Sequence, residues 1–273
     1  MLTAIIILLI IAALLCLLFV LALRGRTRHS LLRKLRKWKY AHRGLHGNGV
    51  PENSLWAFRN AVEHGYGSEL DIHLLADGNL AVIHDSSLKR TAGVDIAIES
   101  LSTGDLKNYF LEGTQETIPT LQEVLDVYDG KAPLIIELKS EGGNYNALTE
   151  TACKALESYK GLYCFESFDP RCIRWLKVNR PDVVRGQLAH NSLRDKPGTV
   201  PLIIRFLMTN LISNFWNSPD FIAYNFPDRN WLSVQISRKF WKIQGVSWTL
   251  RNPDDFKTAV EEDWIPIFEG FEP

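Results

Sequence analysis

The chain has 273 residues, and 46% of them are hydrophobic, which is enough to form one large buried core. Lysine plus arginine and aspartate plus glutamate both number 31, so the formal net charge is zero. This balance disfavours a nucleic-acid-binding protein, which usually carries a basic excess over its binding domain. The four cysteines contain no Cys-x-x-Cys pair, which favours reduced structural thiols over disulfides or a zinc site.

An apolar run at residues 2–23 is the clearest single feature. Thr3 is its one polar residue, and no residue in it is charged. As a helix it would be about 33 Å long, enough to cross a hydrocarbon core of about 30 Å. A cleaved signal peptide is the alternative, but basic residues should then precede a shorter apolar stretch, and a small-residue cleavage site should follow. Arg24-Gly25-Arg26 follows instead. We therefore predict a transmembrane helix over residues 1–23.

Residues 24–38 form a basic segment, which we predict to be a juxtamembrane linker. Positive charge beside a membrane span favours the cytoplasmic side, so we expect a single-pass membrane protein with a cytoplasmic catalytic domain. Interleaved leucines and Trp38 leave two interpretations open: the segment lies on anionic headgroups, or it is a solvated linker that only sets the topology. The basic residues that follow the run are Arg24, Arg26, Arg28, Arg33, Lys34, Arg36, Lys37 and Lys39.

Residues 39–273 alternate short apolar stretches with amphipathic ones, and we assign them to one domain. Eight strands alternating with helices predict a closed (β/α)8, or TIM-type, barrel. An open doubly wound sheet is the alternative, but Gly44-x-x-Gly47-x-Gly49 does not match its phosphate-binding turn. The predicted strands are Tyr40–Gly44, Glu69–Leu74, Pro133–Lys139, Leu162–Phe168, Val183–Ala189, Phe221–Asn225, Gly245–Leu250 and Ile265–Phe268. The predicted helices are Ser54–His64, Thr120–Tyr128, Asn146–Ser158, Pro170–Asn179, Trp231–Phe240 and Pro253–Glu262.

Two stretches interrupt this alternation. Asn79–His84 follows an Asp77-Gly78 turn and is expected to return as a hairpin strand, after which residues 86–118 form a polar excursion. Residues 201–216 are apolar and lack the charges of an ordinary surface helix. We expect this stretch to be a buried barrel helix, with a lid or a second lipid contact as the alternatives.

Three carboxylates stand out by their positions on predicted strands. Glu69 and Asp71 are two residues apart, so their side chains face the same side of the strand. Glu137 lies near the end of an apolar strand, at the carboxyl mouth of a barrel. Three converging carboxylates would suit a hard cation, Mg²⁺ or Ca²⁺. Ordinary salt bridging, for example between Glu137 and Lys139, is the alternative for each carboxylate taken singly.

Two histidines favour the cation site over simple salt bridging. His42 lies in the first strand, and His84 ends the return strand. A histidine pair near a metal fits phosphoryl chemistry, because one can take a proton from the attacking oxygen while the other gives one to the leaving oxygen. Arg43 and Lys139 would hold the phosphate charge. The remaining histidines are expected to have surface or packing roles; among them are His46, His64, His73 and His190.

The order of these motifs resembles that of the glycerophosphodiester phosphodiesterases. The resemblance covers nearly everything after residue 40. It implies a TIM-type barrel, one divalent cation, and hydrolysis of a diester that joins glycerol phosphate to an alcohol. The motifs are His42-Arg43, Pro51-Glu52-Asn53-Ser54, Glu69-Leu70-Asp71, His84-Asp85, Ile118-Pro119-Thr120-Leu121, Glu137-Leu138-Lys139, Ser167-Phe168 and Ser247-Trp248-Thr249.

The resemblance also implies a role for each matching residue. It makes Glu69, Asp71 and Glu137 the metal ligands, and it makes His42 and His84 the general acid and base. Arg43 and Lys139 become phosphate contacts, and Glu52 supports the site. Trp248 becomes a wall for the glycerol or headgroup, with core packing as the alternative. The chain departs from the family at its last strand, where Ile265 to Pro273 replace a segment resembling Ile-Ile-Thr-Asp-x-Pro. That departure affects the expected shape of the substrate pocket.

We therefore expect a membrane-anchored phosphodiesterase that hydrolyses glycerophosphodiesters, with no nucleic-acid partner and no protein partner predicted. The attacking group, water or a neighbouring glycerol hydroxyl, stays open. A phospholipase D-like enzyme acting on membrane lysolipids is the nearest alternative. A catalytically silent, membrane-anchored binding module is the alternative from another class. The absence of a Gly-x-Ser-x-Gly motif from the sequence argues against a serine hydrolase.

Overall fold

Parallel strands form a closed barrel in the computed structural model of the protein, which describes residues 1–196 and 200–273. Each barrel strand pairs with the next, and β1 pairs with both β2 and β9, which closes the ring. The predicted TIM-type barrel is therefore confirmed. Its strands are β1 (Tyr40–His42), β2 (Gly67–Leu74), β4 (Leu134–Leu138), β5 (Tyr163–Ser167), β6 (Arg185–Ala189), β7 (Phe221–Asn225), β8 (Gln244–Leu250) and β9 (Trp264–Phe268).

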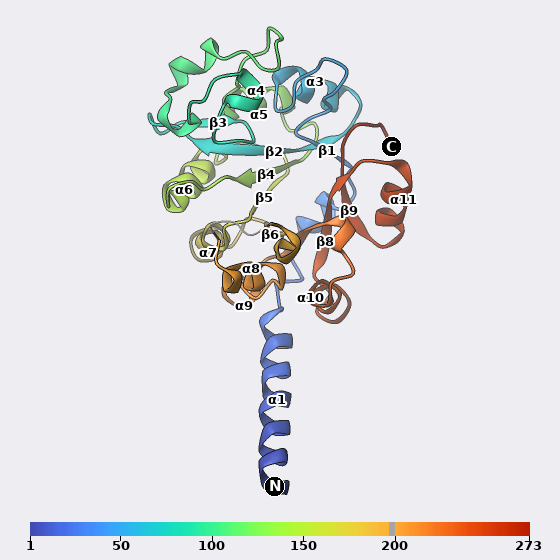
Figure 1. Cartoon of the computed structure of the whole chain (residues 1–273). Coiled ribbons are helices and arrows are strands. Elements are labelled where there is room, and N and C mark those ends of the chain that lie inside the picture. Colours follow the sequence, from blue (N-terminus) through green and yellow to red (C-terminus); the bar gives the residue numbers. More distant parts are fainter. Residues whose placement is uncertain (197–199) are drawn as a thin grey trace.

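Helices surround the strands, as the alternating pattern predicted. In Figure 1, α3, α5, α6, α7, α10 and α11 lie around the barrel, and α1 projects from the side that carries α8, α9 and α10. The helices are α3 (Leu55–Glu63), α5 (Leu121–Tyr128), α6 (Tyr145–Ala155), α7 (Pro170–Asn179), η3 (Ser192–Arg194), α8 (Leu202–Thr209), α9 (Asn214–Asn217), η4 (Phe226–Asp228), α10 (Leu232–Gln235), η5 (Ile236–Phe240) and α11 (Pro253–Glu261).

Side-chain caps fix where several of these helices begin. Ser54 accepts a hydrogen bond from the amide of Ala57 at the start of α3. Thr120 and Glu123 form a reciprocal capping box at the start of α5. Such caps satisfy backbone N–H groups that have no partner within the helix. The caps explain why these two helices begin where the sequence predicted.

The predicted return strand is present but short. β3 (Leu80–Val82) pairs antiparallel with β2, and beyond it the backbone amide of Ile83 donates to the carbonyl of Asp71. Residues 86–118 contain only short helical turns and bury a small apolar cluster against β3. The turns are α4 (Lys89–Ala92), η1 (Ile98–Ser100) and η2 (Thr103–Asn108).

Residues 24–38 pack against the barrel through two buried leucines, while most of their basic residues stay exposed. Leu32 and Leu35, in the short helix α2 (Leu32–Leu35), are buried against inward-facing residues of the barrel strands. The Tyr40 hydroxyl donates to the carbonyl of Leu35. Arg26 forms two hydrogen bonds with Asp220, the residue just before β7. The leucines close the amino-terminal end of the barrel because burial removes their apolar surface from water.

The stretch 201–216 is not the buried barrel helix that we expected. The junction of α8 and α9 packs inward through Leu211, and Thr209, the last residue of α8, is also buried. The outer faces of both helices remain exposed. Their exposed apolar side chains are Leu202, Ile203, Ile204, Phe206, Phe215 and Trp216.

The apolar run forms one helix, α1 (Leu2–Ala22), that is long and apolar enough to cross a membrane. Its length, composition and position fit a signal sequence equally. The end of the helix is docked on the barrel domain: Leu23 is fully buried, and the indole of Trp241 donates to the carbonyl of Val20 at 2.7 Å. The four cysteines are unbridged, in agreement with the predicted thiols, and Cys16 lies exposed on α1.

Candidate active site

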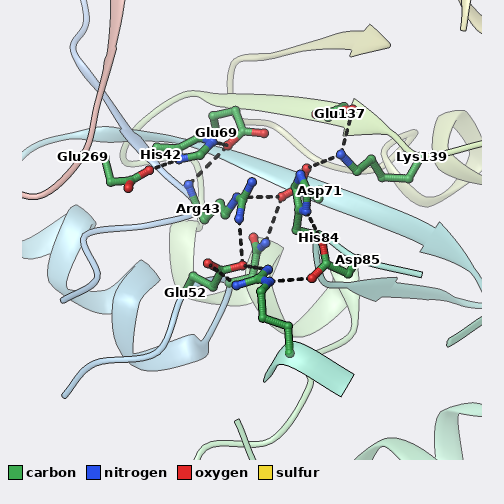
Figure 2. Close-up of polar contacts among 12 residues, drawn as sticks. His42, Arg43, Glu52, Glu69, Asp71, His84, Asp85, Glu137, Lys139 and Glu269 are labelled. Carbon is green, nitrogen blue, oxygen red and sulfur yellow. Dashed lines mark hydrogen bonds and ion pairs between the residues drawn. The ribbon is translucent and has the colours of Figure 1, made fainter. Parts of the chain in front are cut away.

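Acidic residues of β2 and β4 meet at the carboxyl end of the barrel. Glu69 and Asp71 point to the same side because alternate residues of a strand share a face. Glu137 on β4 lies in register with Asp71. Oxygen atoms of these three side chains lie within 4.8 Å of one another, and all three residues are buried. Figure 2 shows the cluster with His42, Arg43 and Lys139 around it.

The charges of these carboxylates conflict with their burial. Burial raises the pKa of Glu69 well above its usual range, and the charges of Asp71 and Glu137 add to the shift. Burial also raises the pKa of Glu137, to about 7. Burial opposes ionisation of Asp71 as well, but Lys139 and Arg43 outweigh it and hold the pKa of Asp71 below its usual range. The cluster is therefore short of positive charge.

This donor set fits a hard divalent cation. Such cations prefer carboxylate oxygens, and a cation would remove the repulsion that raises the pKa of Glu69 and Glu137. Glu166 on β5 lies in register with Glu137 and continues the acidic row. Its Oε2 atom is buried and has no hydrogen-bond partner in the described part of the chain. Glu69, Asp71 and Glu137 could therefore hold a metal, and His42, His46 and Glu269 form a second group of potential ligands.

Two cationic side chains flank the carboxylates. The Nζ atom of Lys139 lies 3.0 Å from Oε1 of Glu137 and 3.2 Å from Oδ1 of Asp71. Burial would lower the pKa of Lys139, but Glu137 and Asp71 raise it above its usual range, so the ammonium group stays charged. The Nη1 atom of Arg43 donates to Glu52 at 2.9 Å, and Nε lies 3.5 Å from Oδ2 of Asp71.

The loop after β1 fixes Arg43 in this position. Gly44 has a φ of +81°, and a Cβ atom there would lie 2.8 Å from Cβ of Ala57 on α3. Only glycine allows the loop to approach the helix so closely. Asn53, from the same loop, donates to Oδ2 of Asp71 at 2.9 Å. The loop is therefore tied to both the helix and the acidic cluster.

His42 ends β1 and joins a carboxylate through each ring nitrogen. Its Nδ1 atom lies 2.5 Å from Oε2 of Glu269, and its Nε2 atom lies 3.7 Å from Oε2 of Glu69. Burial would raise the pKa of Glu269, but the hydrogen bond with His42 lowers it to about 2. An ionised carboxylate only accepts hydrogen bonds, so Nδ1 carries the hydrogen. Burial also lowers the pKa of His42, which favours the neutral ring. In a neutral ring with its hydrogen on Nδ1, the Nε2 atom carries a lone pair and can accept a proton.

His84, like His42, has a carboxylate at its Nδ1 atom. Its Nδ1 atom lies 2.6 Å from Oδ1 of Asp85, and burial lowers the pKa of its ring. The guanidinium of Arg90, on α4, donates to Asp85 at 2.5 Å and to Oε1 of Glu52 at 2.6 Å. Glu52 therefore links Arg43 to the residues that hold His84. Each histidine of the predicted pair thus has a carboxylate on Nδ1.

A cavity of about 140 Å³ joins these groups. Trp248 lines it, and the ring of Phe168 packs edge-on against the indole at 5.8 Å between centroids. Lys139 lines the adjoining groove, and Glu52 lies behind the site and acts through arginines. The structure therefore brings together all of the predicted site residues. The predicted residues that line the 140 Å³ cavity are His42, Arg43, Glu69, His84, Glu137 and Trp248.

Sequence reasoning missed two residues that a simple pattern could have identified. Glu269 follows Ile265 and Ile267 at alternate positions of β9, so the inward-facing row of that strand continues to it. We expected the unusual ending to affect only the pocket, but Glu269 contacts His42 directly. Glu166 follows Cys164 in the same way on β5.

Two other contacts had no signal in the sequence. Arg90 lies in the polar excursion, and its partners are 5 and 38 residues away. His73, expected to have a surface or packing role, is buried and its Nε2 atom lies 3.1 Å from the backbone oxygen of His84. Its Nδ1 atom lies 2.6 Å from Glu99. These contacts depend on how the excursion folds back over β2.

Sequence comparisons connect this site to known proteins. A glycerophosphodiester phosphodiesterase of Bacillus altitudinis is 39% identical over 130 residues, which cover 44% of this chain and 53% of that protein. A lysophospholipase D of Rattus norvegicus is 31% identical over 149 residues, which cover 48% of this chain and 46% of that protein. The chain thus spans about half the length of these two relatives.

Solved structures share the fold. A phosphodiesterase of Oleispira antarctica, in complex with the product sn-glycerol-3-phosphate, has a TM-score of 0.70 at 22% identity, covering 85% of this chain and 92% of that one. A glycerophosphodiester phosphodiesterase of Thermotoga maritima has a TM-score of 0.64 at 24% identity, with 84% and 92% covered. The glycerophosphoryl diester phosphodiesterase family model matches residues 42–268, which span the barrel from β1 to β9. The chain therefore belongs to the glycerophosphoryl diester phosphodiesterase family.

Proposed function

We propose that this chain hydrolyses glycerophosphodiesters to glycerol phosphate and an alcohol, with one divalent cation, Mg²⁺ or Ca²⁺. The observation that carries this proposal is the buried carboxylate cluster beside two histidines, each bonded to a carboxylate through Nδ1. Membership of the family supports the substrate class. The product sn-glycerol-3-phosphate is bound by the related Oleispira antarctica phosphodiesterase, which supports the same class.

Glu69, Asp71 and Glu137 would hold the cation. When bound, the cation supplies positive charge that neutralises the phosphate and polarises one of its oxygens. The carboxylates would then compete less for Arg43 and Lys139. These two side chains would be available to hold the phosphate, arginine through a planar pair of donors and lysine as a point charge.

His42 and His84 act as the acid–base pair. The carboxylate on each Nδ1 fixes the ring orientation and leaves Nε2 for proton transfer. One histidine takes a proton from the attacking oxygen, which belongs to water or to the neighbouring glycerol hydroxyl. The other gives a proton to the leaving oxygen. Glu52 positions Arg43, and Trp248 forms a wall for the glycerol or headgroup.

Turnover by purified full-length protein tests this function. We expect release of glycerol phosphate from glycerophosphoethanolamine, loss of release with a chelator, and recovery with Mg²⁺ or Ca²⁺. His42→Ala and His84→Ala should each lower kcat by at least about 10²-fold while the cation still binds. Glu261→Gln, on the exposed side of α11, is the control. Cation binding without turnover on any diester would support the silent binding module instead.

We further propose that α1 remains attached and anchors the domain in a membrane. The docked end of the helix supports this, because cleavage would remove the contacts of Leu23 and Val20 with the barrel domain. Around that end lies a set of exposed apolar side chains, here called the apolar face. Its members are Leu202, Ile203, Phe206, Phe215, Trp216, Leu232 and Phe240. Contact with lipid would remove this surface from water.

The proposed orientation places the barrel on the cytoplasmic side. Most of the basic residues between Arg24 and Lys39 remain exposed near the end of α1, although Arg26 is held by Asp220. Positive residues within about 15–20 positions of a span favour the cytoplasmic side. The domain boundaries follow from the same proposal: residues 1–23 form the membrane helix, whose last residues are docked on the barrel, residues 24–38 connect that helix to the barrel, and residues 39–273 form the catalytic domain.

A further inference from the structure

An apolar cavity of about 280 Å³ lies beneath α8, beside the mouth of the barrel. Side chains of α8 form one wall, and residues that follow β5 and end β6 form the other. The lining includes Ile204, Leu207, Met208, Phe215, Phe168 and Leu188. The proposed reaction of a glycerol phosphate diester uses none of these side chains.

Two polar residues line this cavity, but their groups are already occupied. The amide nitrogen of Gln187 donates to the backbone oxygens of Ser167 and Leu188, and its oxygen accepts from Asn217 at 2.6 Å. Ser213 donates to the same oxygen at 3.4 Å. The cavity therefore presents mainly hydrocarbon to an occupant. A charged headgroup would lose its hydration there without gaining a partner.

The cavity adjoins the active site and shares lining residues with it. Phe168 and Leu188 also line the cavity that contains His42 and Trp248. Ile204, Met208 and Phe168 also line the groove that contains His84 and Lys139. One molecule could therefore place a polar group at the carboxylate cluster and an apolar group beneath α8.

The cavity also adjoins the docked end of α1. Ile212, which lines the cavity, packs with Phe19 against the buried cluster that contains Leu23 and Leu211. Phe215 and Trp216 line the cavity and also belong to the apolar face. In Figure 1, α8 and α9 lie at the end of the barrel domain from which α1 projects. An apolar chain would thus enter from the side that faces the bilayer.

We propose that this cavity binds the single acyl or alkyl chain of a lysolipid-type glycerophosphodiester while its phosphate lies at the carboxylate cluster. This inference rests on the proposed function, because it names the substrate class of the same site. One cavity of this size beside one phosphate site suits one chain. Burial of a chain in an apolar cavity stabilises the complex in proportion to the area removed from water.

A chain-length series with one headgroup tests the proposal. Full-length protein in detergent would be assayed on glycerophosphoethanolamine and on its 1-acyl derivatives with two, four, six and eight carbons, below the concentrations at which they aggregate. We expect kcat/KM to rise by about fourfold for each methylene that enters the cavity, the factor that corresponds to the free energy of burying one methylene. A flat series, with turnover intact, would overturn the chain site and leave the proposed function standing.

A pair of variants locates the effect on α8. Leu207→Trp fills the cavity, and Leu202→Trp adds the same ring to the same helix at an exposed position outside the cavity. We expect Leu207→Trp to lower kcat/KM for the eight-carbon substrate by at least about tenfold and Leu202→Trp to leave it unchanged. Both should keep the wild-type rate on the substrate without a chain. Equal effects of the two variants on the eight-carbon substrate would contradict the proposal.

A cross-linking experiment does not depend on turnover. A lysolipid with a photoreactive diazirine at the end of its chain would be bound to the wild-type protein and irradiated. We expect the label on peptides between residues 202 and 216, with competition by unlabelled lysolipid. Label there without any turnover would remove the proposed function and keep the chain site. Label confined to α1 or to α11 would overturn the chain site.

Discussion

Substitution can test whether the buried carboxylates at the barrel mouth bind the cation. Glu69→Ala or Asp71→Ala should abolish turnover and weaken cation binding together, since each removes an oxygen ligand from a three-carboxylate cluster. Titration calorimetry with Mg²⁺ and Ca²⁺ would measure the binding. Glu63→Gln, exposed at the end of α3, is the matched control. Unchanged cation affinity in both alanine variants would remove these residues from the ligand set.

Glu269 should control which nitrogen of His42 carries the hydrogen. Glu269→Gln keeps the size of the side chain but lets an amide N–H face Nδ1, which would favour the wrong tautomer. We expect kcat to fall by about 10²-fold, with cation affinity unchanged. Glu272→Gln, three residues further and exposed, should have no effect. A near-normal kcat for Glu269→Gln would show that the tautomer of His42 is set elsewhere.

The same carboxylate should make the stability of the protein depend on pH. Burial would raise the pKa of Glu269, but the hydrogen bond and charge of His42, together with Arg251, lower it to about 2. A folded-state pKa below the unfolded value stabilises the fold above about pH 4.5, and this contribution is lost as the pH falls towards 2. Denaturant unfolding should therefore show a smaller loss of stability between pH 5 and pH 3 in Glu269→Gln, by about 1 kcal/mol after allowance for solvent screening.

The sequence predicted the residues of the site that lie in short, characteristic motifs. The motifs His42-Arg43 and Glu69-Leu70-Asp71 can each be recognised from two or three neighbouring residues. Arg90 could not be found in this way, because its contacts with Glu52 and Asp85 depend on the path of an irregular excursion. Periodicity describes which face of a strand a residue occupies, and it carries no information about how a loop returns to the barrel.

At the scale of elements, α2 closes the amino-terminal end of the barrel. Leu35→Ala should lower the free energy of unfolding by about 3 kcal/mol, since the leucine is buried and truncation leaves a cavity. Lys37→Ala, exposed two residues later, should change it by less than about 0.5 kcal/mol. Chemical denaturation would measure both. A small effect of Leu35→Ala would mean that the barrel end is closed without this side chain.

The sequence predicted some elements better than others, and α2 is an example of one that it missed. The strand that begins at Tyr40 and the strand that ends at Phe268 were predicted because each is a short apolar stretch that can be recognised within a few neighbouring residues. Residues 24–38 were assigned to a linker because their basic residues dominate the composition, yet the two leucines of α2 determine where the segment packs. Residues 201–216 were expected to be buried because an uncharged apolar stretch is typical of a core helix, and the same pattern also fits the lipid contact that was the alternative.

At the scale of the whole molecule, the basic segment should hold the barrel on the cytoplasmic side. A cysteine introduced at Val178, exposed on α7, should resist an impermeant thiol reagent in intact cells and react after permeabilisation. A cysteine introduced at Leu2 should react in intact cells. Cys16 would be replaced by serine in both variants, since the other native cysteines are buried. Strong labelling at Val178 in intact cells would reverse the assignment.

The docked end of α1 joins the helix to the barrel domain through a stiff connection and not through a flexible tether. Leu23 is fully buried, Trp241 holds the carbonyl of Val20, and Arg26 is clamped by Asp220. A barrel on a flexible tether would tumble and meet the bilayer in every orientation. If α1 spans a membrane as proposed, a barrel on a stiff joint takes its orientation from the helix, so the same rim faces the lipid. Adding flexible glycines between Leu21 and Leu23 should therefore slow the reaction of bilayer-embedded diesters and spare that of dissolved ones, although both proteins remain in the membrane.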